Sequence, residues 1–204
     1  GRGGIGRITK FDPSNLKTQI AGELKEFNPE PTLDAREARR IDLFSQYGIV
    51  AGAQAVEDSG FDPASLDPFR VGVILGSGIG GINVLEQQVE TYLTKGPGRV
   101  SPFYITGMIT NMVAGHIAMK FGFKGPNYVT TSACASGCHA IGDAYHAIRR
   151  GEADIILAGG TEGAITGASL AGFINIQALS RRNDDPEHAS RPFEKNRSEK
   201  HTSE

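Results

Sequence analysis

The stretch Val129-Thr130-Thr131-Ser132-Ala133-Cys134-Ala135-Ser136-Gly137 marks the point where an apolar strand passes directly into a helix. We expect the strand over residues 127–133 and the helix over residues 134–150, which places Cys134 in the first helical turn. Small residues flank the cysteine on both sides and leave space around its thiol. A strand that feeds a helix in this way is the basic unit of α/β proteins.

The neighbouring sequence repeats this unit. Short apolar strands are expected over residues 71–75 and 154–158, and glycines follow each of them. Helices are expected over residues 34–58, between an Asp34 N-cap and Gly60, and over residues 83–94 and 106–121. A weaker strand is expected within residues 18–24. Alternating strands and helices predict an α/β layer structure with a mainly parallel sheet.

The position of Cys134 suits a nucleophile. Unpaired N–H groups and the positive end of the helix dipole favour the thiolate, which is the reactive form of cysteine. An N–H group at the helix start can also stabilise an oxyanion. The alternative is a buried structural cysteine, because cysteine is among the most buried residue types. Cys138 lies one turn further along the helix, and we expect it to pack as a small apolar residue.

Residues 76–81 read Gly-Ser-Gly-Ile-Gly-Gly after a strand and match the G-x-G-x-x-G dinucleotide fingerprint. A dinucleotide site also needs a second strand with an acidic residue about 20 positions on. In this chain Lys95-Gly96-Pro97-Gly98 follows instead. We therefore expect no nucleotide cofactor, and we interpret the glycines as a sign of backbone crowding beside a pocket.

Composition excludes several classes of protein. A net charge of −2 does not support nucleic-acid binding, and no apolar run approaches the ~20 residues that a membrane span needs. Two cysteines four residues apart fit neither a disulfide nor a zinc site, so a reducing, cytoplasmic location is expected. The histidines show no metal-ligand spacing, and His116 is expected to be a core histidine with its hydrogen bonds satisfied.

Arg36, Arg39 and Arg40 have i, i+3, i+4 spacing on the first expected helix and would form one basic patch. Such charges are usually a solvated helix face. Docking of an acidic partner is the alternative.

With these residues in view, the chain resembles the elongating β-ketoacyl-acyl-carrier-protein synthases, of the synthase II type, over nearly its whole length. The resemblance is carried by Ile8-Thr9-Lys10-Phe11-Asp12, Gln46-Tyr47-Gly48-Ile49-Val50-Ala51-Gly52, the glycines of residues 76–81, Asn111-Met112-Val113-Ala114-Gly115-His116, Ser132-Ala133-Cys134, Ala158-Gly159-Gly160-Thr161-Glu162, Ala178-Leu179-Ser180 and Ser190-Arg191-Pro192-Phe193.

The resemblance implies a thiolase-like fold of layered α-β-α-β-α type, found in homodimers, and a reaction that needs no cofactor. An acyl group would move from acyl carrier protein to Cys134, and malonyl-acyl carrier protein would then condense with it. The resemblance places Ile79, Ala133 and Phe173 in the acyl pocket, with Ile79 as its gate, and Ile105 in the pocket of the dimer partner. It also identifies Arg36, Arg39 and Arg40 as the carrier-protein docking surface.

Two features depart from the family pattern. By the resemblance, we expect the first strand of the family to precede Gly1, and we expect the family's second half, which holds the two histidines of the condensation step, to lie beyond residue 197. We therefore expect residues 1–197 to be an N-terminal half and residues 198–204 to be an unrelated polar tail. Turnover by this chain alone is not expected. A polyketide ketosynthase would share every motif, whereas a silent chain-length subunit would normally lack Cys134.

Overall fold

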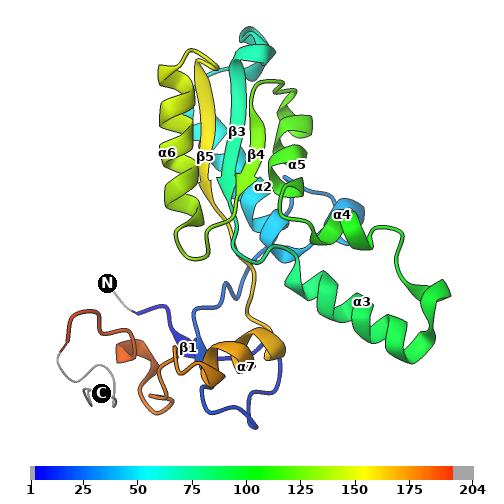
Figure 1. Ribbon diagram of the computed structural model, residues 1–204, viewed down its shortest axis with the longest axis vertical. Coiled ribbons are helices and arrows are strands. Elements are labelled where there is room, and N and C mark those ends of the chain that lie inside the picture. Colours follow the sequence, from blue (N-terminus) through cyan, green and yellow to red (C-terminus); the bar gives the residue numbers. More distant parts are fainter. Residues whose placement is uncertain (1–2, 195–204) are drawn as a thin grey trace. The chain divides into compact units, whose positions relative to one another are not determined.

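The computed structural model describes residues 3–194 of the chain, which form two compact units. The larger unit is Asn28–Ala164. The smaller unit combines the N-terminal segment, up to Phe27, with the segment that begins at Ile165. The colours of Figure 1 follow the residue numbers, so that the segments of each unit can be found in it.

A three-stranded parallel sheet forms the centre of the larger unit (Figure 1). Its strands are β3 (Val71–Gly76), β4 (Asn127–Thr130) and β5 (Ile155–Gly160), in the order β4-β3-β5. Every residue of the central strand β3 is buried, which explains its continuous apolar sequence. The parallel sheet and the existence of the three expected strands are confirmed. Their bounds differ, because β4 ends at Thr130 instead of residue 133 and β5 continues to Gly160.

Helices cover both faces of this sheet. On one face, α2 (Leu43–Ser59) and α5 (Met112–Phe121) pack against Val71, Val73 and Leu75 of β3. On the other, α6 (Ser136–Arg149) packs on Ile74 through its buried alanines, Ala140, Ala144 and Ala147. Successive residues of β3 thus face opposite layers, as the twofold period of a strand requires.

The single helix expected over residues 34–58 is wrong, because the structure divides it into α1 (Ala35–Ala38) and α2. Asp34 caps α1 as predicted, and Gly60 ends α2 in a left-handed conformation. The break is caused by Asp42, an extended residue whose buried carboxylate caps α2 and also accepts hydrogen bonds from the Val84 N–H and the Asn83 amide. These bonds join α2 to α3 (Ile82–Lys95).

The helix expected over residues 106–121 is also two elements, α4 (Tyr104–Met108) and α5. Ile109, the C-cap of α4, is extended with ψ of 139°, which ends the helix. The Met108 carbonyl instead accepts a hydrogen bond of 2.9 Å from the Gly81 N–H. The glycine-rich loop that follows β3 is therefore fastened to the end of α4.

The smaller unit contains a two-stranded antiparallel sheet and one helix. Strand β1 (Gly6–Arg7) pairs with β2 (Ile20–Ala21), which lies within the strand expected over residues 18–24. Ile8 packs with two residues of α7 (Gly167–Asn175) to form a small core.

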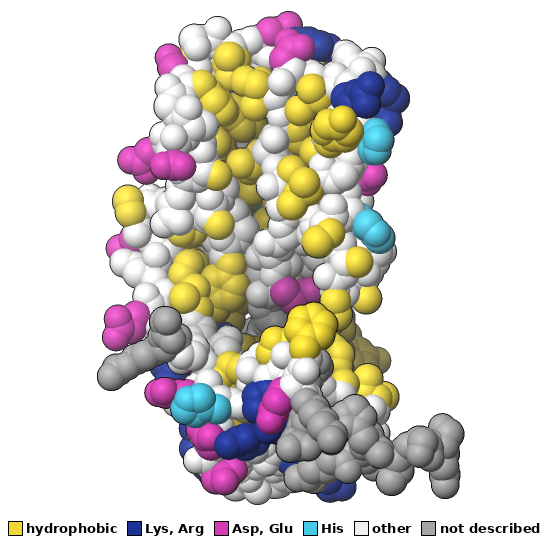
Figure 2. All heavy atoms as spheres, turned by 90° about the vertical axis from the view of Figure 1, so that its left-hand side faces the viewer, with side chains coloured by type: hydrophobic (Ala, Val, Ile, Leu, Met, Phe, Trp, Pro, Cys, Tyr) yellow, Lys and Arg dark blue, Asp and Glu magenta, His cyan; other side chains and the backbone are white. Residues whose placement is uncertain are grey.

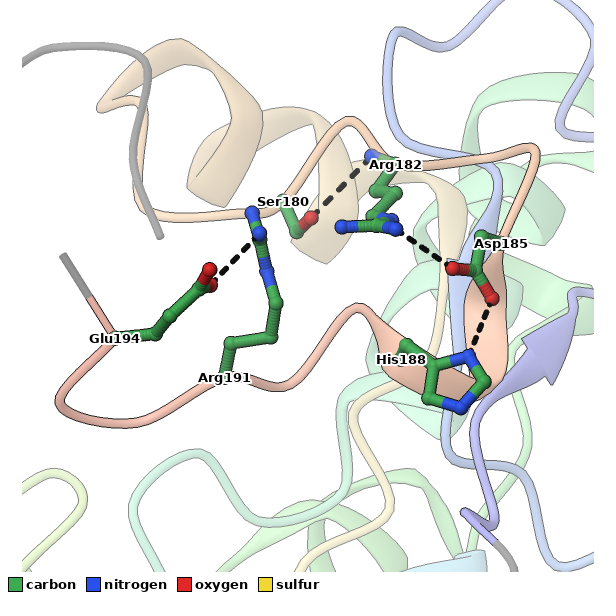
Figure 3. A network of polar contacts seen from close by, with 6 residues as sticks. All are labelled: Ser180, Arg182, Asp185, His188, Arg191 and Glu194. Atoms are coloured by element: carbon green, nitrogen blue, oxygen red, sulfur yellow. Dashed lines mark hydrogen bonds and ion pairs between the residues drawn. The ribbon is translucent and has the colours of Figure 1, made fainter. Parts of the chain in front are cut away.

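A polar network orders the C-terminal part of this unit (Figure 3). Asp185 accepts hydrogen bonds from Arg182 at 2.7 Å and from His188 at 2.8 Å. The bond from His188, with a further contribution from Arg182, holds the pKa of Asp185 below its ordinary value. Arg191 pairs with Glu194 at 2.7 Å.

The polar tail expected over residues 198–204 lies outside the described residues. No helix within residues 3–194 is both long enough and apolar enough to cross a membrane.

Candidate active site

The carboxyl ends of the three parallel strands meet at one edge of the sheet. Residues 77–81 follow β3, Cys134 follows β4, and Thr161 and Glu162 follow β5. Ligands of open parallel sheets bind outside this edge of the strands. The residues at this edge are therefore the candidate site.

Cys134 lies in a tight turn between β4 and α6. The helix begins at Ser136 with Ala135 as N-cap, so the prediction that Cys134 occupies the first helical turn is wrong. Two backbone bonds cause this, one from the Ala135 N–H to the Ser132 carbonyl and one from the Ser136 N–H to the Ala133 carbonyl. Ala133 has φ of 51°, in the left-handed region that costs a non-glycine residue energy. The strand ends before this turn and presents Cys134 just ahead of the helix.

The buried hydroxyl of Ser136 holds the turn together. It donates to the Ala133 carbonyl at 2.6 Å and accepts from the Ser132 N–H at 2.9 Å. The Thr131 hydroxyl donates to the Ser77 carbonyl at 3.0 Å, which ties this turn to the loop after β3.

Glycines allow the start of α6 to lie directly on the strand backbones. A Cβ atom at Gly76 would lie 2.2 Å from the Ser136 carbonyl carbon, and one at Gly160 would lie 2.9 Å from the Gly137 Cα. No larger side chain fits at these two contacts. The approach fixes the turn at Cys134 against the centre of the sheet.

Both cysteines are free thiols on the surface of the larger unit. The prediction that Cys138 packs as a small apolar residue is wrong, because the residue lies on the outward side of α6. Exposure therefore does not distinguish the two thiols. Their surroundings do, since Cys134 alone belongs to the hydrogen-bonded turn.

The glycine-rich loop donates its N–H groups to the protein's own carboxylate. Oε2 of Glu162 accepts from the Gly78 N–H at 2.8 Å and from the Ile79 N–H at 3.1 Å. In a dinucleotide site, such N–H groups would bind a phosphate. The loop also lies against the cysteine turn, because a Cβ at Gly78 would be 3.4 Å from the Ala133 carbonyl oxygen.

Three of the four residues predicted for the acyl pocket lie on connected segments of the larger unit. Ile79, on the glycine-rich loop, is 41% exposed and adjoins Ala133 through Gly78. Ile105, on α4, is 55% exposed, and its helix is fastened to the same loop. Phe173 lies on α7 in the smaller unit.

The three arginines predicted for docking are exposed at the end of α1 and just after it. They do not share one regular helix, because α1 ends before Arg39. The guanidinium of Arg40 lies 4.6 Å from the centre of the Phe103 ring, so this side chain also has a packing role. Arg36 and Arg39 carry no such contact with a ring among the described residues.

His116 on α5 is half-buried, and its Nε2 has no hydrogen-bond partner within the described part of the chain. The expectation of a fully satisfied histidine is therefore wrong. Burial lowers the pKa of His116, although Glu37 opposes this shift. Across residues 3–194, no three His, Cys, Asp or Glu side chains come together as metal ligands would.

Sequence reasoning missed two side chains at this site. Glu162 was noted only as part of a family motif, although an acidic residue just beyond a strand ending in Gly-Gly was a usable signal. His139 has its Nδ1 2.6 Å from the Ser132 hydroxyl oxygen. The bend at Ala133 brings them together, and no spacing rule predicted that bend.

Comparison with known proteins gives the family. Residues 1–196 match the family described as "Beta-ketoacyl synthase, N-terminal domain". The chain belongs to the β-ketoacyl synthase family. A 3-oxoacyl-[acyl-carrier-protein] synthase 2 of Synechocystis sp. is 49% identical to this chain over 97% of the chain and 47% of that protein. The chain thus spans about half the length of the curated relatives it matches.

Solved structures agree with a thiolase-like fold for this chain. A β-ketoacyl synthase from Burkholderia phymatum matches 97% of the chain and 48% of its own, with a TM-score of 0.83 and 31% identity. A type II polyketide ketosynthase in complex with its acyl-carrier protein matches 74% of the chain and 43% of its own, with a TM-score of 0.70 and 30% identity.

Proposed function

We propose that this chain carries the acyl-accepting site of a 3-oxoacyl-acyl-carrier-protein synthase of fatty-acid elongation, with Cys134 as nucleophile. The observation that carries this proposal is the turn at Cys134. It combines an exposed thiol, a left-handed residue before it and a helix that begins two residues after it. A sharp strand-to-helix turn that exposes a nucleophile is a recurrent device of acyl transfer.

The reaction has two steps. The Cys134 thiolate attacks the acyl carbonyl carbon of an acyl-carrier thioester, a new C–S bond forms, the bond to the carrier sulfur breaks, and the carrier leaves as a thiolate. Malonyl-acyl carrier protein then loses CO₂, and the freed electron pair on its α-carbon attacks the Cys134 thioester. A C–C bond forms as the cysteine thiolate leaves, which gives a 3-oxoacyl chain two carbons longer. The family resemblance assigns the histidines of the second step to the second half of the family's fold.

The same proposal includes the partners. Acyl carrier protein would dock at Arg36, Arg39 and Arg40, and a second copy of the chain would complete a homodimer in which Ile105 reaches the partner's pocket.

The exposed side of α6 carries Ile141, Tyr145 and Ile148, and Figure 2 shows hydrophobic side chains gathered on this side of the larger unit. We propose that the second half of the fold covers this side. Two free thiols suit a reducing compartment such as the cytoplasm.

A polyketide ketosynthase is the second candidate, favoured by the match to the type II polyketide complex. The two candidates differ in the acyl group they accept. A fatty-acid enzyme takes a fully reduced chain from its carrier, whereas a polyketide enzyme takes one that retains keto groups.

Acylation of the thiol tests the proposal. The purified protein is incubated with straight-chain acyl-acyl carrier protein, digested, and examined by mass spectrometry for a thioester. We expect the acyl group on Cys134, with no acylation of the Cys134→Ser variant. The Cys138→Ser variant is the matched control and should be acylated normally, because the Cys138 thiol is also exposed but lies outside the turn. An acyl group found only on Cys138 would refute the assignment.

A further inference from the structure

The loop of residues 77–81 is held from one side by a single carboxylate. Oε2 of Glu162 accepts from the N–H groups of Gly78 and Ile79, and Oε1 lies 3.3 Å from the Ser77 hydroxyl, which donates to it. The Ser77 hydroxyl oxygen also accepts from the Gly80 N–H at 3.2 Å. Every residue from 77 to 80 is thereby bonded to Glu162 directly or through Ser77.

The opposite side of the loop is fixed by close packing. A Cβ at Gly80 would lie 3.0 Å from the Met108 carbonyl oxygen, and one at Gly81 would lie 2.5 Å from the Gly107 carbonyl oxygen. Gly80 has φ of 73°, a conformation that favours glycine. The loop is thus clamped between the end of α4 and Glu162. Ile79 is its bulky apolar residue, and 41% of that residue is exposed.

We propose that Glu162 is a positioning residue that sets the acyl-chain preference by fixing the loop that carries Ile79. This inference rests on the proposed function, because it takes Ile79 as the gate of the acyl pocket. Glu162 bonds to the backbone of Gly78 and Ile79 and so determines where the isoleucine side chain begins. When those bonds are lost, the loop is still held at its two ends, at Ser77 by Thr130 and Thr131 and at Gly80 and Gly81 by α4. The N–H groups of Gly78 and Ile79 between these ends lose their acceptor, and Ile79 is free to move.

The chemistry of the bonds favours a carboxylate for this task. Hydrogen bonds to an ionised acceptor are roughly twice as strong as neutral ones. One oxygen accepts both N–H bonds, so a glutamine in the same position can accept both through its amide oxygen. Alanine can accept neither. A comparison of glutamate, glutamine and alanine at position 162 therefore separates the effect of the negative charge from the effect of the two hydrogen bonds.

The experiment measures the loop and the acyl preference separately. Amide hydrogen exchange of Gly78 and Ile79 is expected to be at least about tenfold faster in Glu162→Ala and close to wild type in Glu162→Gln. Acylation rates of Cys134 are then measured with acyl carrier protein loaded with straight chains of graded length. The long-to-short rate ratio should change by about tenfold in Glu162→Ala, the lower end of what a pocket discriminates per methylene. Glu162→Gln should restore most of the wild-type ratio.

Asp154→Ala is the matched control, because Asp154 precedes the other end of β5 and pairs with Arg70 away from the loop. It should change neither the exchange rates nor the rate ratio. A Glu162→Ala protein with wild-type exchange at Gly78 and Ile79, or with an unchanged rate ratio, overturns the inference. Wild-type protein that is not acylated on Cys134 overturns the proposed function instead, and the exchange measurement still decides whether Glu162 holds the loop.

Discussion

The hydroxyl oxygen of Ser132 lies 2.6 Å from Nδ1 of His139, so that a hydrogen bond spans the turn that carries Cys134. Ser132 is two residues before the cysteine, and His139 is one helical turn into α6. The bond closes the turn on its outer side, whereas the buried Ser136 hydroxyl closes it on the inner side. The turn that carries the thiol is therefore held on an exposed side by the bond between Ser132 and His139 and on a buried side by the Ser136 hydroxyl.

His139→Ala is expected to slow alkylation of Cys134 by iodoacetamide about threefold to tenfold, because a typical hydrogen bond contributes about 0.5–1.5 kcal/mol. Quenched-flow labelling with peptide mass spectrometry measures the rate. His146→Ala is the control, since His146 lies on the same helix and contacts Tyr145 instead. Equal rates in both variants would mean that the outer bond does not position the thiol.

Gly76→Ala is expected to destabilise the fold by about 3 kcal/mol, the upper end of the usual overpacking cost. The new methyl group would lie within 2.5 Å of the backbone of Ser136 and Gly137, and backbone cannot rotate away. Gly142→Ala is the control, because nothing lies within 4 Å of its Cβ position within α6. That variant should be about 0.4–1 kcal/mol more stable than wild type. Urea unfolding measures both, and similar midpoints would contradict the close approach.

His116 predicts a pH dependence of stability. Burial lowers the pKa of His116 in the folded state, so the unfolded chain takes up the proton first as the pH falls through about 6.5. The contribution of neutral His116 to the free energy of unfolding is therefore complete above that pH. It is lost as the pH falls toward the folded-state pKa of His116. Between about pH 7.5 and 5.5, the wild type should lose more unfolding free energy than His116→Gln. A parallel loss in both proteins would show that other groups cause the change.

Ile79→Phe should reject all but the shortest acyl chains if Ile79 is the gate of the pocket. The larger ring would fill space beside Ala133, because the two segments adjoin at Gly78. The profile of Cys134 acylation against chain length measures this. Iodoacetamide, which needs no pocket, should react at the wild-type rate. An unchanged profile would exclude a gating role.

The double variant Arg36→Glu/Arg39→Glu tests carrier docking better than a triple change, because Arg40 also packs on Phe103. Each exposed charge pair contributes only ~0.2–1 kcal/mol, so two reversals are needed for a clear effect. We expect a higher KM for acyl-acyl carrier protein and an unchanged KM for a small acyl thioester such as an N-acetylcysteamine derivative. Equal increases for both substrates would show a general defect rather than a docking surface.

The sequence predicted the parts of this fold that depend on local periodicity. The buried strand β3 and the end of α2 at Gly60 follow from an apolar run and from glycine chemistry. Strand β5 instead continues to Gly160, past its expected end at residue 158. The two divided helices could not be predicted in this way. Asp42 and Met108 break them through hydrogen bonds to residues about 25–40 positions away, which no local pattern records.

The candidate site was predicted to a similar extent. Cys134 was found because its neighbours in sequence are also its neighbours in space. Glu162 was not, since its bonds to Gly78 and Ile79 span more than 80 residues and exist only once the parallel strands align. The exposure of Cys138 was missed because α6 places alanines, rather than its larger apolar residues, against the sheet.

The left-handed backbone of Ala133 restricts which residues evolution or protein engineering can place next to Cys134. Glycine adopts that conformation freely and asparagine or aspartate tolerates it, but β-branched residues are genuine outliers there. A mutant library that samples valine or isoleucine at position 133 would mostly yield proteins with a displaced Cys134. Position 79 is the more accessible site for substitution, because its side chain can vary while the backbone stays where Glu162 holds it.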